Sequence, residues 1–278
     1  MKVKETRIIW LILVLVVLLP MIRPLGLPLG PSPEGEAAYE TVDSIPQDAI
    51  TIMDLSIAPS SEGELWPMAL AVARHHMSKG HRIIAGTFNP DGIMYAEKIR
   101  AVAEQEYGYQ YGTDFIILPY RAGNETAVVA MADDLTKAYE VDQYGTPLSD
   151  LPMWKDVRGI KDIALVSSYS AFDNHLWLAR HVWAKHRVPC LGGVIALSAA
   201  EAITYFQNGQ LAGVISGVKG AAYYETRIEK PGLAIQSMDA QSMGHGFLLV
   251  LMILGNIVFW KNKKDRGAAN GQEVQSHV

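Results

Sequence analysis

Short apolar runs alternate with longer amphipathic segments between residues 50 and 216. The short runs have the length and composition of buried strands, and the longer ones repeat apolar residues at helical spacing. This alternation predicts βαβ units and a mostly parallel sheet with helices on both faces. We therefore expect a three-layer, doubly wound α/β fold, either Rossmann-like or flavodoxin-like. The expected strands are 50–55, 82–88, 115–118, 163–167, 189–195 and 211–216, and the expected helices are 64–79, 90–107, 124–135, 173–185 and 199–208.

An apolar run without charged residues lies on each side of this region, at 8–22 and at 247–260. Both are shorter than the ~20 residues of a typical transmembrane helix, but apolar neighbours extend them. The first run, with its basic start, fits an uncleaved anchor or a signal peptide, and the lack of an Ala-x-Ala site favours the anchor. Basic residues precede the first run and follow the second. The positive-inside rule therefore predicts two transmembrane helices, cytoplasmic termini and an extracytoplasmic central domain.

These patterns divide the chain into five parts. We expect a cytoplasmic tip with an anchor, an extended linker rich in Pro, Gly and acidic residues, the α/β domain, a membrane-proximal and transmembrane helix, and a cytoplasmic tail. Their respective bounds are 1–29, 30–48, 49–232, 233–262 and 263–278. Within the domain, residues 139–161 interrupt the alternation and are interpreted as a bridge between two β-α halves of the domain. A lid is a second interpretation of this segment.

Composition excludes several classes of function. The chain has 278 residues and a formal net charge of −5, so it offers no basic surface of the kind that binds nucleic acid. Cys190 is the single cysteine, which rules out an intrachain disulfide. The glycine-rich phosphate-binding motifs and the His-Glu-x-x-His zinc motif are absent from the sequence. We therefore expect no cofactor and no metal.

The loops that follow the strands are where a parallel sheet binds ligands. Arg121, beside the start of a helix, is the best candidate for binding an anion. Ser61 has the spacing of a capping box with Glu64, so capping is the alternative to ligand binding there. The candidate ligand-binding residues are Asp54, Ser60, Ser61, Glu62, Asn89, Tyr120, Arg121, Asn124, Ser168, Ser170, Asp173 and His175.

Ser168 or Ser170 with His175 and an acid, Asp54 or Asp173, is the one combination that suggests nucleophilic catalysis. The Gly-x-Ser-x-Gly elbow of α/β-hydrolases is missing, so no catalytic residue is assigned.

Small residues recur nearly four apart at Gly213, Gly217 and Gly220. This spacing fits either a smooth helix face for close packing or a strand with tight turns. Polar residues continue into the second apolar run, where a buried amide such as Asn256 usually finds a partner on another helix. The candidate partner-contacting residues are Gly213, Gly217, Gly220, Glu225, Asp239, Gln241, His245 and Asn256.

Two stretches, GQLAGVISGVKGAAYYE and AIQSMDAQSMGHGFLLVLMILGNI, resemble a little-characterised group of prokaryotic membrane-anchored α/β proteins of unknown function. The likeness extends over residues 54–256 and implies an anchored α/β domain, without an activity. The group's pattern has Ala-Glu-Tyr-Glu where this chain has Ala-Tyr-Tyr-Glu at 222–225, which implies that Glu225 matters more than its neighbours.

Three functions follow as hypotheses. The first is a non-catalytic subunit or scaffold of a membrane complex, with a membrane-protein partner or a second copy of the chain beside the second apolar helix. The second is an extracytoplasmic domain that binds or senses a small anionic ligand. The third is a membrane-tethered hydrolase.

Overall fold

The computed structural model describes residues 3–275 and contains a six-stranded sheet with the order β3-β2-β1-β4-β5-β6. Every strand pair is parallel. The predicted α/β fold with a parallel sheet is therefore confirmed, and the strand order is the Rossmann-like one. The strands are β1 (Ile50–Asp54), β2 (Arg82–Gly86), β3 (Phe115–Ile117), β4 (Ile163–Ser170), β5 (Cys190–Val194) and β6 (Gly213–Ser216).

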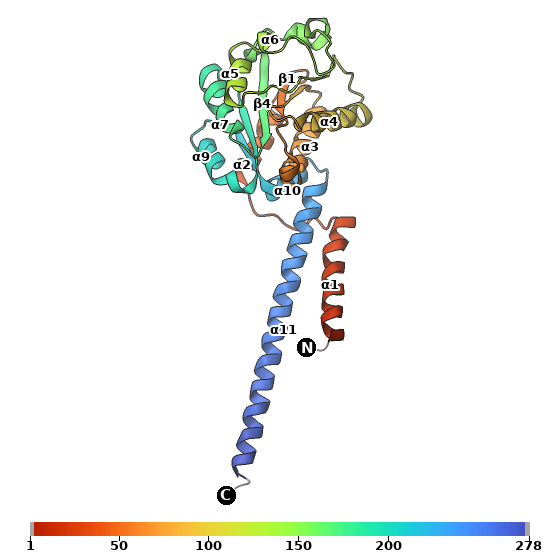
Figure 1. Cartoon of the computed structure of the whole chain (residues 1–278), viewed down its shortest axis with the longest axis vertical. Helices are drawn as coiled ribbons and strands as arrows, with labels where there is room; N and C mark the ends of the chain where they lie inside the picture. The colour runs from red at the N-terminus through yellow and green to blue at the C-terminus, as the bar shows by residue number, and fades with distance from the viewer. Residues whose placement is uncertain (1–2, 276–278) are drawn as a thin grey trace. The chain divides into compact units, whose positions relative to one another are not determined.

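Helices cover both faces of the sheet (Figure 1). One face carries α2 (Pro33–Asp43), α3 (Glu62–Ser78), α4 (Gly92–Tyr107) and α10 (Gly217–Arg227). The other face carries α5 (Glu125–Asp133), α7 (Asn174–Leu178) and α9 (Ala199–Gln207), with the short α6 (Leu135–Ala138) and α8 (Ala184–His186) nearby in sequence. The predicted helix 173–185 has a π-helical stretch, Ala179–Trp183, in its middle. Because α3 and α7 lie on opposite faces, β1 and β4 form the switch point of the sheet.

The expected linker 30–48 is not extended, because much of it folds as α2 on the sheet. Ala38 and Val42 of this helix are fully buried. The helix crosses β6 so closely that a Cβ atom on Gly213 would lie 2.4 Å from the Ala38 Cα atom. The Pro-rich and acidic composition hid this helix, although Pro33 and Glu34 suit a helix N-terminus.

Residues 139–161 pack against the edge of the sheet. The Gln143 N–H donates to the carbonyl of Ile117, at the end of the edge strand β3. Leu148, Met153 and Trp154 are buried in the hydrophobic core. The 3₁₀ turns of this region are Leu148–Asp150, Pro152–Asp156 and Ile160–Asp162. These contacts describe a covered sheet edge rather than a lid.

The glycine-rich run 208–225 contains a strand followed by a helix, so the strand interpretation holds for its first part. Gly213 begins β6, whereas Gly217 and Gly220 lie in α10. Gly217 has φ +58°, the left-handed conformation that glycine adopts without strain. The glycines therefore serve a tight strand-to-helix turn and close packing within the domain.

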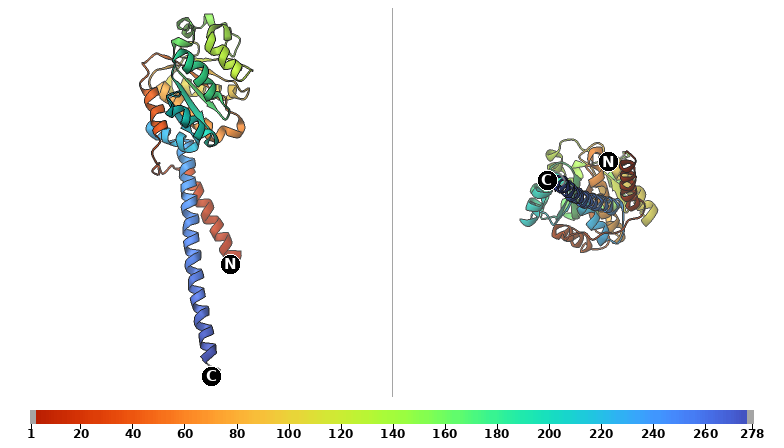
Figure 2. Two further views of the ribbon diagram at one scale, coloured as in Figure 1. Left: turned by 90° about the vertical axis from the view of Figure 1, so that its left-hand side faces the viewer. Right: turned by 90° about the horizontal axis from the view of Figure 1, so that it is seen from below.

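The two apolar runs form α1 (Val3–Ile22) and α11 (Leu233–Gln275), and Figure 2 shows α11 as one uninterrupted helix. Among the described residues, only the stretch Leu233–Lys261 is long and apolar enough to cross a membrane, and Thr6–Ile22 forms a shorter apolar helix. The structure thus supports one of the two predicted transmembrane helices by length. Residues 26–235 form a compact unit of their own, which holds the sheet.

Candidate functional site

A cavity of about 480 Å³ opens at the carboxyl ends of β1, β2, β3 and β4. It lies at the switch point between β1 and β4, where Rossmann-like folds bind their ligands. Its walls come from the loops after these four strands and from the first turns of the helices that follow. The lining residues are Ser56, Phe88, Asn89, Pro90, Tyr120, Asn124, Ala171, Phe172, Asp173, Asn174 and Trp177.

Asp54 lies directly behind this wall and is 2% exposed. Its carboxylate accepts hydrogen bonds from the Ser168 hydroxyl at 2.6 Å and from the Asn174 amide at 2.8 Å. The hydroxyl of Ser56 donates to the same carboxylate at 2.5 Å. The three donors come from different segments, so Asp54 ties the loop after β1, strand β4 and the start of α7 together.

The Asp54 carboxylate also positions the loop after β2, through Ser56. The Ser56 oxygen accepts the backbone N–H of Phe88 at 2.9 Å. Burial raises the pKa of Asp54, and its hydrogen bonds from Ser168, Ser56 and Asn174 oppose that rise. A buried carboxyl with this set of donors is a rigid support for the cavity wall.

The cavity is bordered by the starts of three helices. Asn89 and Pro90 precede α4, Asn124 precedes α5, and Asp173 precedes α7. The Asn89 side-chain oxygen accepts the N–H of Asp91 at 3.0 Å. Asn124 has φ 49° and ψ −120°, a conformation that costs a non-glycine residue free energy. Strain of this kind concentrates at binding sites, which supports the prediction that Asn124 binds a ligand.

Aromatic rings form the apolar part of the wall. Phe88 is buried and Trp177 is partly buried, whereas Tyr120 is 40% exposed and Phe172 is 55% exposed. Exposed aromatic rings at a cavity offer flat surfaces on which a ligand can stack.

Four of the residues predicted as ligand-binding meet at the cavity, namely Asn89, Tyr120, Asn124 and Asp173. Asp54 and Ser168 lie behind it, bonded to each other. Sequence reasoning missed Ser56, Asn174 and three of the four aromatic residues, namely Phe88, Phe172 and Trp177. Ser56 could have been found, because it lies two residues after Asp54, in the loop that follows the same strand.

Ser60, Ser61 and Glu62 do not line the cavity. Ser61 ends a 3₁₀ turn, Pro59–Ser61, and its hydroxyl donates to the Ala58 carbonyl at 3.0 Å. It makes no capping bond to α3, so the predicted capping box is wrong. Its partner in that box, Glu64, instead accepts the N–H of Ala196 at 2.8 Å, and Glu62 pairs with Lys98 at 3.2 Å.

Arg121 does not line the cavity, so its guanidinium is not placed to bind an anion there. Its guanidinium donates to the Ala138 carbonyl and lies 5.6 Å from the centre of the Tyr139 ring. The residues described as lining the cavity include no Lys, Arg or His. The predicted preference for an anionic ligand therefore has no side-chain support.

The serine and histidine of the hydrolase hypothesis are not paired. Ser168 and Ser170 belong to β4, which extends further than predicted because β5 pairs with it as far as Ser170. His175 is 1% exposed, and no hydrogen bond among residues 3–275 joins its ring to Ser168 or Ser170. In this part of the chain, neither serine is therefore held beside the His175 imidazole, and the Ser168 hydroxyl bonds to Asp54 instead. Within the described residues, no group of His, Cys, Asp and Glu could hold a metal ion either.

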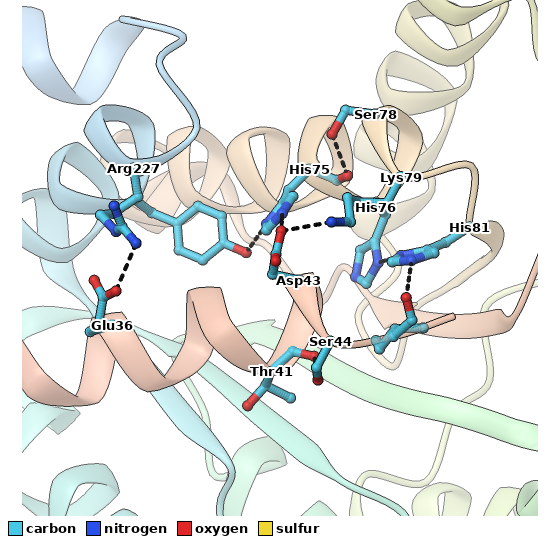
Figure 3. Close-up of polar contacts among 12 residues, drawn as sticks. Glu36, Thr41, Asp43, Ser44, His75, His76, Ser78, Lys79, His81 and Arg227 are labelled. Atoms are coloured by element: carbon cyan, nitrogen blue, oxygen red, sulfur yellow. Dashed lines mark hydrogen bonds and ion pairs between the residues drawn. The ribbon is translucent and has the colours of Figure 1, made fainter. Parts of the chain in front are cut away.

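A second buried polar cluster joins α2, α3 and α10 (Figure 3). His75 contacts the Tyr224 hydroxyl at 2.9 Å through Nδ1 and the Asp43 carboxylate at 3.4 Å through Nε2. The Nδ1 atoms of His76 and His81 are 3.0 Å apart, and His81 Nε2 donates to the Ile45 carbonyl at 3.1 Å. Burial lowers the pKa values of His76 and His81, which favours neutral rings, and in a neutral His81 the Nδ1 atom accepts from His76. We refer to His75, His76 and His81 as the histidine cluster.

Glu225, singled out by the sequence resemblance, holds the start of α11. Its buried carboxylate accepts the backbone N–H groups of Gly232 at 3.0 Å, Ala234 at 3.1 Å and Ile235 at 2.9 Å. These amides include the first ones of α11, which have no partner within the helix. Glu225 therefore serves a structural role.

Asn256 and Asp239, two of the α11 residues predicted to contact a partner, bond within the chain. The Asn256 amide donates to the Met252 carbonyl of its own helix at 3.0 Å, so it does not require another helix. Asp239 accepts the N–H of Leu25 at 2.6 Å. Gln241 and His245 remain predictions as partner-contacting residues.

Comparisons of this chain with protein-family models, with curated proteins and with solved structures found no match.

Proposed function

We propose that this chain is a membrane-anchored α/β domain that binds a small molecule in the cavity at its switch point. The observation that carries the proposal is the cavity itself, because its size falls within the ~300–1,000 Å³ typical of ligand sites. Its wall combines aromatic rings with hydrogen-bonding side chains from the loops after four strands. Asp54, behind the wall, holds one of these loops by direct bonds and another through Ser56.

The anchor in this proposal is α11, whose stretch Leu233–Lys261 has the length and hydropathy of a membrane span. Basic residues follow it directly, at Lys261, Lys263 and Lys264. By the positive-inside rule this end is cytoplasmic and the α/β domain extracytoplasmic, with α1 as a second anchor.

Native mass spectrometry of the full chain, released from mild detergent after purification from its own membranes, tests the proposal. We expect a bound small molecule that is lost in Ala171→Trp, because the indole would fill the cavity that Ala171 lines. Ala200→Trp, at an exposed alanine on α9, is the matched control and should keep the ligand. A ligand retained by Ala171→Trp would contradict binding at this cavity.

A role as a non-catalytic subunit of a membrane complex is a second proposal. It is supported by the apolar surface of α11, where Leu249, Met252 and Trp260 are among the exposed side chains. Native gels after mild detergent extraction should then show a complex larger than one chain, and a uniform monomer without co-purifying protein would argue against it.

A further inference from the structure

We infer that the ligand of the cavity is an uncharged sugar, either one ring or two. The inference rests on the proposed function, because it names the chemical class of the molecule bound there. Three properties of the wall lead to it, namely its hydrogen-bonding groups, its exposed rings and its charge.

The hydrogen-bonding groups match hydroxyls. Asn89, Asn124 and Asn174 line the cavity, and an amide has both a donor and an acceptor end. The Asn89 side-chain oxygen already accepts the Asp91 N–H. Asp54 orients the Asn174 amide by holding its nitrogen at 2.8 Å, which leaves the carbonyl oxygen and the second amide hydrogen for a ligand. A sugar hydroxyl also both donates and accepts, so neighbouring hydroxyls on a ring can bond to such amides in pairs.

The exposed rings match the apolar face of a sugar ring. Phe172 and Tyr120 keep 55% and 40% of their surface exposed while lining the cavity. Exposed aromatic surface is costly in water, and it becomes favourable when the C–H face of a sugar covers it. Amides beside a flat aromatic surface therefore suit a molecule that has hydroxyls at its edge and C–H groups on its face.

The charge of the wall favours an uncharged ligand. Asp173 is the one charged side chain among the described residues that line the cavity, so neither a phosphate nor a carboxylate finds a cationic partner. The starts of α4 and α5 bring partial positive charge to the same space, and the Asp173 carboxylate brings negative charge, so the wall favours an ion of neither sign. Asp173 makes no capping bond to α7, so its carboxylate is available to accept hydroxyls.

Saturation-transfer NMR on the detergent-solubilised full chain tests the inference. The probes are glucose, galactose, mannose, N-acetylglucosamine, maltose and cellobiose, with adenosine, choline and inorganic phosphate as representatives of the other ligand classes. We expect signal from at least one sugar, and at least a tenfold weaker affinity in Phe172→Ala. Leu197→Ala, which removes an apolar side chain that is 89% exposed and does not line the cavity, should bind as the unmodified chain does.

The outcomes separate this inference from the proposed function. If adenosine, choline or phosphate binds in a way that Phe172→Ala abolishes, and no sugar does, the sugar assignment is overturned while small-molecule binding stands. Sugar binding that Phe172→Ala leaves unchanged overturns the assignment to this cavity. If no probe binds and no small molecule co-purifies in native mass spectrometry, both proposals are overturned.

Discussion

Asp54 with its three hydrogen-bond donors, here called the Asp54 cluster, and the histidine cluster both bury ionisable side chains in the α/β unit. The two clusters use their hydrogen bonds differently. Asp54 accepts from Ser56, Ser168 and Asn174, and two of these donors also line a cavity. The histidines bond to one another, to Tyr224, to Asp43 and to a backbone carbonyl. Burial of polar groups therefore does not by itself indicate a binding site, whereas a buried group that supports a polar cavity wall does.

The two clusters also respond to pH in opposite directions. Burial raises the pKa of Asp54, so this group favours the folded state at low pH and that contribution is lost as the pH rises through its folded pKa. Burial lowers the pKa of His75 to about 4 and also lowers the pKa values of His76 and His81. The unfolded chain then binds protons that the folded chain does not, so the histidines cost stability as the pH falls below about 6.5.

Removal of the shared acceptor should have the largest effect. Asp54→Ala leaves the Ser168, Ser56 and Asn174 donors buried without their partner, so we expect a loss of about 3–5 kcal/mol in the free energy of unfolding. Urea unfolding of the full chain in detergent measures it. Asp156→Ala, which breaks an exposed ion pair with Arg82, is the control and should cost less than about 1 kcal/mol. Equal effects of the two substitutions would show that Asp54 is not a central support.

Gly213→Ala should have the next largest effect. The added Cβ would meet the Ala38 backbone at 2.4 Å, so α2 must shift away from β6. We expect a loss of about 1–3 kcal/mol, as for other overpacked sites. Gly63→Ala is a matched control on a helix, because nothing lies within 4 Å of its Cβ position. If Gly213→Ala were as stable as Gly63→Ala, α2 would not be packed on the sheet as described.

The histidine cluster should make the domain sensitive to acid. Lys79 and Asp43 are the charged groups closest to His75, and they act on its pKa in opposite directions. His76→Met removes one group that titrates only in the unfolded state. Between pH 6 and pH 5, the free energy of unfolding of this variant should fall by about 1 kcal/mol less than that of the unmodified chain. Unfolding curves at several pH values test this, and an unchanged slope would mean that His76 is not buried as a neutral ring.

Relief of the strain at Asn124 should have the smallest effect on stability. Asn124→Gly suits a backbone with φ 49° and ψ −120°. Relief of about 1–3 kcal/mol of strain exceeds the cost of the more flexible unfolded chain, so we expect a net gain of about 0.5–1 kcal/mol. The same change removes an amide from the cavity and should weaken ligand binding. Thermal unfolding and NMR titration measure the two effects. A stabilised variant that binds the ligand as tightly as the unmodified chain would show that Asn124 does not contact it.

Strand and helix periodicity was enough to predict the parallel sheet and to place most of its elements. Polar content misled the prediction at two points, because Ser168 and Ser170 lie within a strand and residues 33–43 form a helix on the sheet. The prediction of loops after each strand found part of the site, including Asn89 and Asn124. Sequence could not show that Arg121 turns toward the Ala138 carbonyl or that Asp54 gathers donors from distant segments, since both depend on tertiary contacts.

Hydrogen exchange of the full chain, with and without a bound sugar, tests the central claim most directly. Binding in the switch-point cavity predicts slower exchange in residues 87–92, 120–126 and 171–177, which line or border the cavity, and unchanged exchange around the histidine cluster. Protection confined to the contact between α2 and α3, or no protection in these three loops, would contradict it.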